Sequence, residues 1–172
     1  MAQQDDGPPA APPPAEPPDD PLFAAIRADD VQRLERALSE GALVDSTAAL
    51  EEEEATDFFS GTVTALILAT RLGHNRIARL LLERGADVHE RDDFGATAVQ
   101  VGAEFGNVKM IVALAAAGGD VNAADDDGFT PVLIAAGAGH TETVRVLAEL
   151  GPMAGTVGLL LQSETTDSRA GL

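Results

Sequence analysis

Landmark residues return at a constant spacing of 33 positions across the middle of this chain. One threonine and two glycines recur in each of three successive segments. The three sets are Thr64, Thr97 and Thr130; Gly73, Gly106 and Gly139; and Gly85, Gly118 and Gly151. A fixed period of this length indicates a stack of similar supersecondary units, each of which buries its apolar face against its neighbours. Such a stack offers a long exposed surface and seldom a closed catalytic pocket, so the spacing favours a binding protein.

The last of these segments carries a family resemblance. It reads TPVLIAAGAGH over residues 130–140 and closes with Leu150 and Gly151, and the segments beginning at Thr64 and Thr97 share its register. This pattern resembles the ankyrin repeat, whose signature is T-P-L-H-x-A on a 33-residue period. The resemblance extends over residues 22–151. It implies an all-α fold, an ankyrin-repeat solenoid of stacked helix–turn–helix units with projecting turns.

The resemblance also divides the chain. Residues 21–151 are expected to form the repeat domain, with units at about 21–45, 62–91, 95–124 and 128–151 and an acidic insertion at 46–61. The insertion is inferred from Gly41, which lies 44 residues before Gly85 instead of 33. It contains four consecutive glutamates, and we expect either a loop or a short acidic helix packed by Phe58 and Phe59.

Both ends of the chain are expected to be tails. Residues 1–20 are rich in proline and acid and poor in apolar side chains, so they cannot bury enough surface to become ordered. Residues 152–172 contain an apolar run, Val157–Leu161, that does not fit the register of a further unit. This run either folds back over the exposed face of the last unit or belongs to a fragment in which more repeats follow.

Helix signals occur at regular positions. Asp20 and Asp30 are candidate N-caps, and Pro21 suits a first helical turn. We expect helices near 65–72, 75–84, 98–105, 108–117, 131–138 and 141–150. A left-handed glycine should end each of them, including Gly151 after the last helix. The segments 90–96 and 123–129 should project as tight turns.

One departure from the family pattern concerns its motif histidine. Ile67, Gln100 and Leu133 stand at that position. The resemblance therefore implies that the hydrogen bond from this histidine to the neighbouring loop is missing.

The bulk composition limits the partners that the chain can take. Its formal net charge of −18 repels the phosphates of nucleic acid and of anionic lipid, so neither is an expected partner. The same charge favours a cationic protein partner, or it simply keeps the protein in solution. The sequence has no secretory signal and no run of apolar residues long enough to span a membrane. A cytoplasmic location is therefore expected, with the nucleus as an alternative in a eukaryotic host.

No arrangement of residues predicts catalysis. Cysteine is absent, which excludes disulfides, thiolate chemistry and cysteine-bound zinc. Phosphate-binding loops and nucleophile elbows are also missing. The three histidines, His74, His89 and His140, occupy repeat positions, and His74 and His140 should satisfy helix-start amides or pack between layers. We expect no enzyme, no metal site and no cofactor.

The ankyrin resemblance implies a concave binding face built from the projecting turns and the ends of the first helices. Phenylalanines on this face would anchor a partner, and carboxylates would steer it. The candidate partner-binding residues are Val63, Arg71, Leu72, Asp93, Phe94, Ala96, Glu104, Phe105, Asp126, Asp127, Phe129 and Ala138, with Gly137 beside them.

The resulting expectation is a non-catalytic protein–protein interaction module, a scaffold or adaptor that is monomeric alone and binds a partner protein with a basic segment. The alternative is a truncated or regulatory portion of a larger multidomain protein whose activity lies elsewhere.

Overall fold

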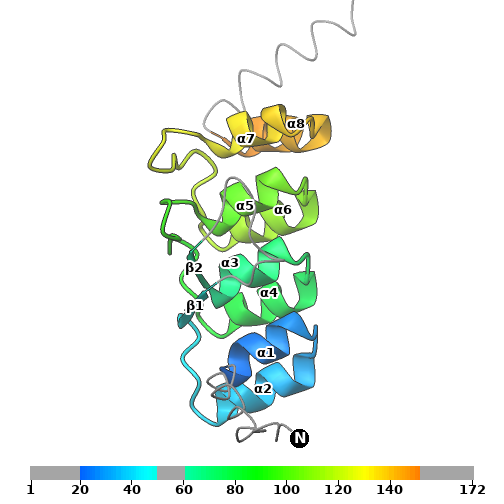
Figure 1. The fold of residues 1–172 in the computed structure, drawn as a ribbon. Helices are drawn as coiled ribbons and strands as arrows, with labels where there is room; N and C mark the ends of the chain where they lie inside the picture. The colour runs from blue at the N-terminus through cyan, green and yellow to red at the C-terminus, as the bar shows by residue number, and fades with distance from the viewer. Residues whose placement is uncertain (1–19, 50–60, 152–172) are drawn as a thin grey trace, which may run out of the picture.

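The computed structural model describes residues 20–49 and 61–151 as a stack of helix pairs with one short pair of strands (Figure 1). Within these residues the elements are α1 (Pro21–Arg27), α2 (Val31–Ser39), β1 (Thr47–Ala49), β2 (Thr62–Thr64), α3 (Ala65–Arg71), α4 (Asn75–Glu83), α5 (Ala98–Glu104), α6 (Val108–Ala116), α7 (Pro131–Gly137) and α8 (Thr141–Leu150). This confirms the helical solenoid predicted from the repeat period. The expected tails, 1–20 and 152–172, lie outside the described residues except for Asp20.

Local caps fix where the first helices begin. The Asp20 carboxylate accepts the Leu22 N–H at 2.9 Å, and Asp30 accepts the Arg33 N–H at 3.0 Å. These bonds satisfy amides that the first turn of a helix leaves without a partner inside the helix. Both predicted N-caps are therefore confirmed.

Left-handed glycines end most of the helices as predicted. Gly73, Gly106 and Gly139 have φ values of +75°, +64° and +78°, a region that strongly favours glycine. The prediction is wrong for Gly151, which leaves α8 with φ −75° and ψ 173°. Pro152 follows in the sequence, and a residue before proline is pushed towards extended backbone.

The helix pairs stack in a common register. α1 packs on α3, α3 on α5 and α5 on α7, while α2, α4, α6 and α8 follow one another in a second column. Every residue of α3 is buried, and a single cluster of buried apolar side chains runs from Leu22 to Leu147. Stability is therefore shared across interfaces between neighbouring units, as expected for a repeat stack.

Polar bonds between layers correct one expectation. The Gln100 amide, fully buried at the position of the motif histidine, donates to the Phe129 carbonyl of the next projecting turn at 2.8 Å. The predicted loss of this hydrogen bond is therefore wrong at this unit, because the glutamine amide replaces the imidazole as donor. The Gln100 carbonyl oxygen also accepts the Thr97 N–H at 3.0 Å, which caps α5.

His74 and His140 make contacts between layers and do not cap helices. His140 Nε2 lies 2.8 Å from the Glu104 carbonyl oxygen of the preceding unit, which confirms the expected packing between layers. His74 Nδ1 lies 3.5 Å from an Asp29 carboxylate oxygen. Of the two alternatives expected for these side chains, contact between layers is the one found, because neither makes a capping bond.

The flanks of the expected insertion form the only strands within residues 20–49 and 61–151. β1 and β2 pair antiparallel, with Thr47 opposite Thr64. The expected loop or acidic helix at the centre of the insertion falls on residues 50–60, outside the described residues. In the part of the chain that is described, no helix has the length and apolarity needed to cross a membrane.

Candidate interaction site

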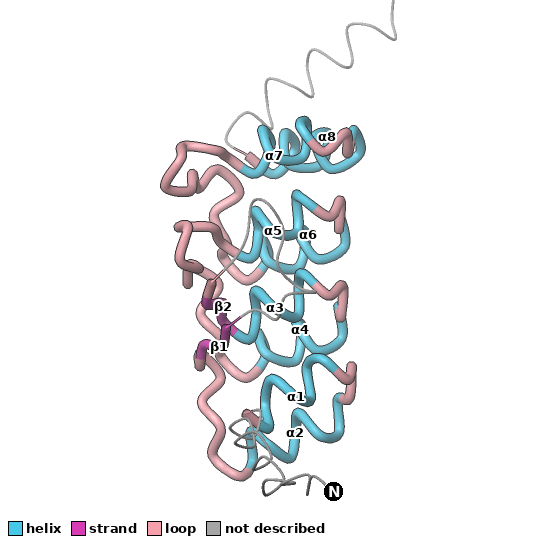
Figure 2. Tube along the Cα trace, in the orientation of Figure 1, coloured by secondary structure: helices cyan, strands magenta, loops and turns pink. Residues whose placement is uncertain are grey.

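Two projecting turns, residues 90–96 and 123–129, stand beside the helices (Figure 2). An aspartate organises each of them. Asp92 Oδ1 accepts the N–H groups of Phe94 and Ala96 at 3.0 and 2.9 Å. Asp125, one period later, accepts those of Asp127 and Phe129 at 3.1 and 2.8 Å. These side-chain bonds hold the turns in the predicted tight conformation.

The two projecting turns are also bonded to each other. The Asp126 N–H donates to the Phe94 carbonyl at 3.1 Å, and Arg91 Nη1 donates to the Ala124 carbonyl at 2.9 Å and to the Gly95 carbonyl. A Cβ atom added at Gly95 would collide with the Asp126 carboxylate. The backbones of the two projecting turns are therefore joined to each other directly.

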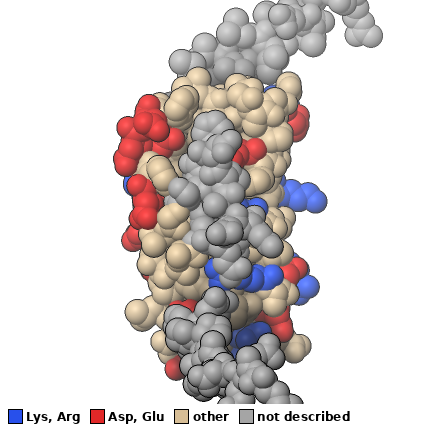
Figure 3. All heavy atoms as spheres, viewed as in Figure 1, with Lys and Arg blue, Asp and Glu red and all other residues tan. Residues whose placement is uncertain are grey.

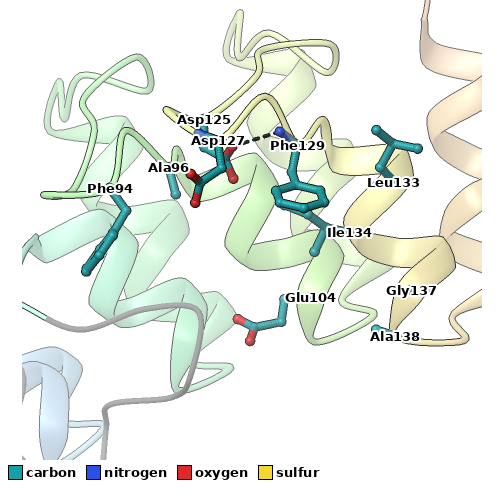
Figure 4. Close-up of a pocket in the computed structure, with 10 residues that line it drawn as sticks. All are labelled: Phe94, Ala96, Glu104, Asp125, Asp127, Phe129, Leu133, Ile134, Gly137 and Ala138. Atoms are coloured by element: carbon teal, nitrogen blue, oxygen red, sulfur yellow. Dashed lines mark hydrogen bonds between the residues drawn. The ribbon is translucent and has the colours of Figure 1, made fainter.

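A pocket of about 540 Å³ opens between the two projecting turns, α5 and α7. Six predicted partner-binding residues line this pocket: Phe94, Ala96, Glu104, Asp127, Phe129 and Ala138. Figure 4 shows Phe94 on one side of the pocket and Phe129 on the other, with Glu104 and Ala138 below them. Phe94 and Phe129 are 41% and 46% exposed, so each ring is available to a ligand without unfolding.

The pocket is hollow because of a change in residue size along the repeat. At the end of the first helix, successive units carry Arg71-Leu72, Glu104-Phe105 and Gly137-Ala138. A methyl group added at Gly137 would meet no other part of the molecule within 4 Å. In the two preceding units, larger side chains occupy these two positions. In the last unit, glycine and alanine leave only backbone and one methyl group there.

Three lining residues were not among the predicted ones. Asp125, Leu133 and Ile134 complete the pocket, together with Gly137. Asp125 could have been found because it stands 33 positions after Asp92 in the same turn. Leu133 and Ile134 could not, because the positions equivalent to them in the preceding unit, Gln100 and Val101, are fully buried.

The other predicted residues lie outside the pocket. Val63 is buried, and Leu72 is half-buried. Arg71 is also buried, with its guanidinium carbon 5.7 Å from the ring centroid of Phe105, a cation–π distance. Phe105 itself is 44% exposed. Asp93 and Asp126 are exposed on the projecting turns.

Acidic side chains predominate around the site. In Figure 3, acidic side chains gather over the projecting turns on one side of the molecule. Burial raises the pKa of Asp92 above its ordinary value, while the N–H donors of Ala96 and Phe94 and the charge of Arg71 oppose that rise. In the described part of the chain, no three His, Cys, Asp or Glu side chains are placed to hold a metal ion.

Asp93 ties the first projecting turn to the base of β2. Its Oδ2 accepts the Thr62 N–H at 2.8 Å, and its Oδ1 accepts the Thr62 hydroxyl at 2.6 Å. Because both donors favour the carboxylate, they hold the pKa of Asp93 below its ordinary value of 3.8. The contact therefore stabilises the fold above that value, and the stabilisation is lost as the pH falls through the lower, folded-state pKa.

This contact predicts an acid titration at a defined atom. In an NMR pH series, the Thr62 amide proton is expected to shift with a midpoint below 3.8, as Asp93 becomes protonated and the bond weakens. Asp93→Asn, which keeps the size and removes the titration, should abolish that shift. A midpoint at or above the ordinary carboxyl value would contradict the contact.

In a comparison with known protein families, one family model matches the chain. The model described as ankyrin repeats (3 copies) matches residues 66–156, which is more than half of the 172 residues. Among curated proteins no match to the chain is found.

Proposed function

The chain belongs to the ankyrin repeat family, whose members are protein–protein interaction modules, and on that premise we propose that its pocket receives a partner segment carrying a basic residue beside an apolar one. The observation that carries this proposal is the pocket between Phe94 and Phe129, with Asp127 and Asp125 at its side. The partner is expected to be a protein, and the chain would act as a non-catalytic adaptor.

The apolar part of the proposed ligand follows from the walls of the pocket. Phe94, Phe129, Leu133 and Ile134 supply aromatic and aliphatic surface, and Ala138 adds little bulk. A buried aromatic or aliphatic anchor in such a pocket typically contributes most of the binding energy of an interface. A pocket of about 540 Å³ falls in the range of sites that enclose a small ligand, so it has room for a large side chain.

The basic part follows from the charges. Asp125 and Asp127 line the pocket, Asp126 lies between them in the sequence, and the whole chain carries a formal charge of −18. Fixed carboxylates attract a cationic segment over several ångströms and speed its association at low salt. They also penalise an acidic competitor, which makes the preference selective.

A peptide library displayed on phage tests this proposal. The library is selected on the wild-type chain, and each recovered peptide is then measured against Gly137→Trp, whose indole would take up space at the lining of the pocket. We expect recovered peptides to combine Arg or Lys with an aromatic or aliphatic residue and to bind the variant at least about tenfold more weakly, a loss of 1.4 kcal/mol.

Gly137→Ala is the matched control. It changes the same position, and its methyl group meets open space, so binding should change by less than about twofold. Gly137 is the last residue of α7, where alanine should stabilise the helix by up to about 1 kcal/mol. Peptides that bind wild type and Gly137→Trp equally well, or that are acidic, would contradict the proposal.

A further inference from the structure

The last unit exposes apolar side chains at positions that are buried one unit earlier. Gln100, Val101 and Ile111 are fully buried between layers. Their equivalents 33 positions later are Leu133, which is 54% exposed, and Ile134 and Val144, which are half-buried. These three residues, on α7 and α8, define the end face of the stack.

The end face exposes apolar side chains to water where polar ones would be expected. A terminal unit of a repeat stack normally carries polar residues on its outer side, because no further unit covers it. Here the polar Gln100 is replaced by Leu133, so the exposed copy of the position is the more apolar one. Clustered apolar side chains of this kind indicate a surface that another segment covers.

We propose that the end face binds residues 157–161 of the same chain. This run contains Val157, Leu159, Leu160 and Leu161, and it is the apolar part of the 21 residues that follow Gly151. Its side chains would give Leu133, Ile134 and Val144 the apolar contacts that α7 gives to α5 one layer below.

The run is within reach of the end face. α8 is ten residues long, or about 15 Å, and it packs against α7. The six residue steps from Gly151 to Val157 can span about 20 Å when extended. A tethered segment also acts at a high effective concentration, so it needs only weak contacts to occupy its site.

Charge argues against a second copy as the occupant. Each chain carries a formal charge of −18, so two copies that meet through this face repel each other, whereas the run itself bears no charge. The proposal does not depend on the partner proposed for the pocket. Leu133 and Ile134 also line that pocket, so the bound run would contact these two side chains from the end face and form one border of the pocket, beside the partner.

A spin label at a single introduced cysteine tests the proposal, because the natural chain has none. The label is placed at Ser163→Cys in the full chain, with methyl groups of Leu133, Ile134 and Val144 observed by NMR. We expect these methyl signals to lose intensity and to recover when the label is reduced. A label at Ser39→Cys, on α2 at the opposite end of the stack, should leave them unchanged.

Two further samples identify the occupant. Leu159→Ser, Leu160→Ser and Leu161→Ser together should restore the methyl signals, whereas Thr165→Ala, Thr166→Ala and Ser168→Ala together should not. Mixing spin-labelled chains with separately isotope-labelled chains should give no loss. Loss of methyl signal in the mixed sample would show that a second copy of the chain occupies the end face. If no sample lost methyl signal, the end face would have to bind some other partner. Either result overturns the proposal.

Discussion

Replacing Leu81 with alanine is expected to lower the free energy of unfolding by about 2–5 kcal/mol. Leu81 lies in α4 with none of its surface exposed, inside the continuous apolar cluster. Truncation removes buried methyl groups and leaves a cavity. The helices on either side of α4 are already packed against their own neighbours, so they can move into this cavity only partly. Urea denaturation followed by circular dichroism measures the effect, because the chain has no tryptophan or tyrosine to report by fluorescence.

Leu43→Ala is the control for this prediction. It deletes the same atoms at a site that is 76% exposed, so its effect should stay within about 0.5 kcal/mol. Equal losses in the two variants would show that α4 is not packed between the layers as described.

The second large effect is expected on binding. Phe129→Ala should weaken a peptide selected on the wild-type chain by about 2 kcal/mol, or roughly 30-fold. Phe129 lines the pocket and is 46% exposed, so the substitution removes a contact surface without opening the core. Its backbone carbonyl still accepts the Gln100 amide, so the second projecting turn should keep its position. Isothermal titration calorimetry gives the affinity.

Phe105→Ala separates the pocket from exposed aromatic surface in general. Phe105 is 44% exposed, almost the same as Phe129, but it does not line the pocket. Its replacement should change the affinity by less than about threefold. If Phe105→Ala weakened the peptide as much as Phe129→Ala, binding would have to extend along the whole face and not centre on the pocket.

The repeat period predicts the helices well because local signals agree with it. Thr64, Thr97 and Thr130 stand directly before the first helices, and Gly73, Gly106 and Gly139 end them in the left-handed conformation. Cap and turn residues bond or shape backbone groups only a few positions away, so a single sequence is enough to predict them. Gly151 shows the limit, because the proline after it changes its backbone preference.

Contacts between units could not be predicted from the sequence in the same way. Gln100 looked like the loss of a motif donor, yet its amide reaches the Phe129 carbonyl in the next turn. The pairing of β1 with β2 depends on where the two flanks of the insertion meet in space. Each contact joins residues far apart in the sequence, and only the stacked geometry brings them together.

The candidate site was predicted in part for the same reason. Phe94 and Phe129 sit in turns that the period locates, so their exposure could be anticipated. The pocket itself arises from what is missing at Gly137 and Ala138, compared with Glu104 and Phe105 one unit earlier. Small residues such as these carry no chemical group that would mark a binding site in a sequence.

NMR titration of the isotope-labelled chain with a selected basic and apolar peptide locates the binding surface without any mutation. We predict that the largest shift changes fall on Phe94, Phe129, Ile134 and Gly137, around the pocket, and weaken as salt is added. Changes confined to α4 and α6, in the second column of helices, with the pocket signals unmoved, would contradict the proposed site.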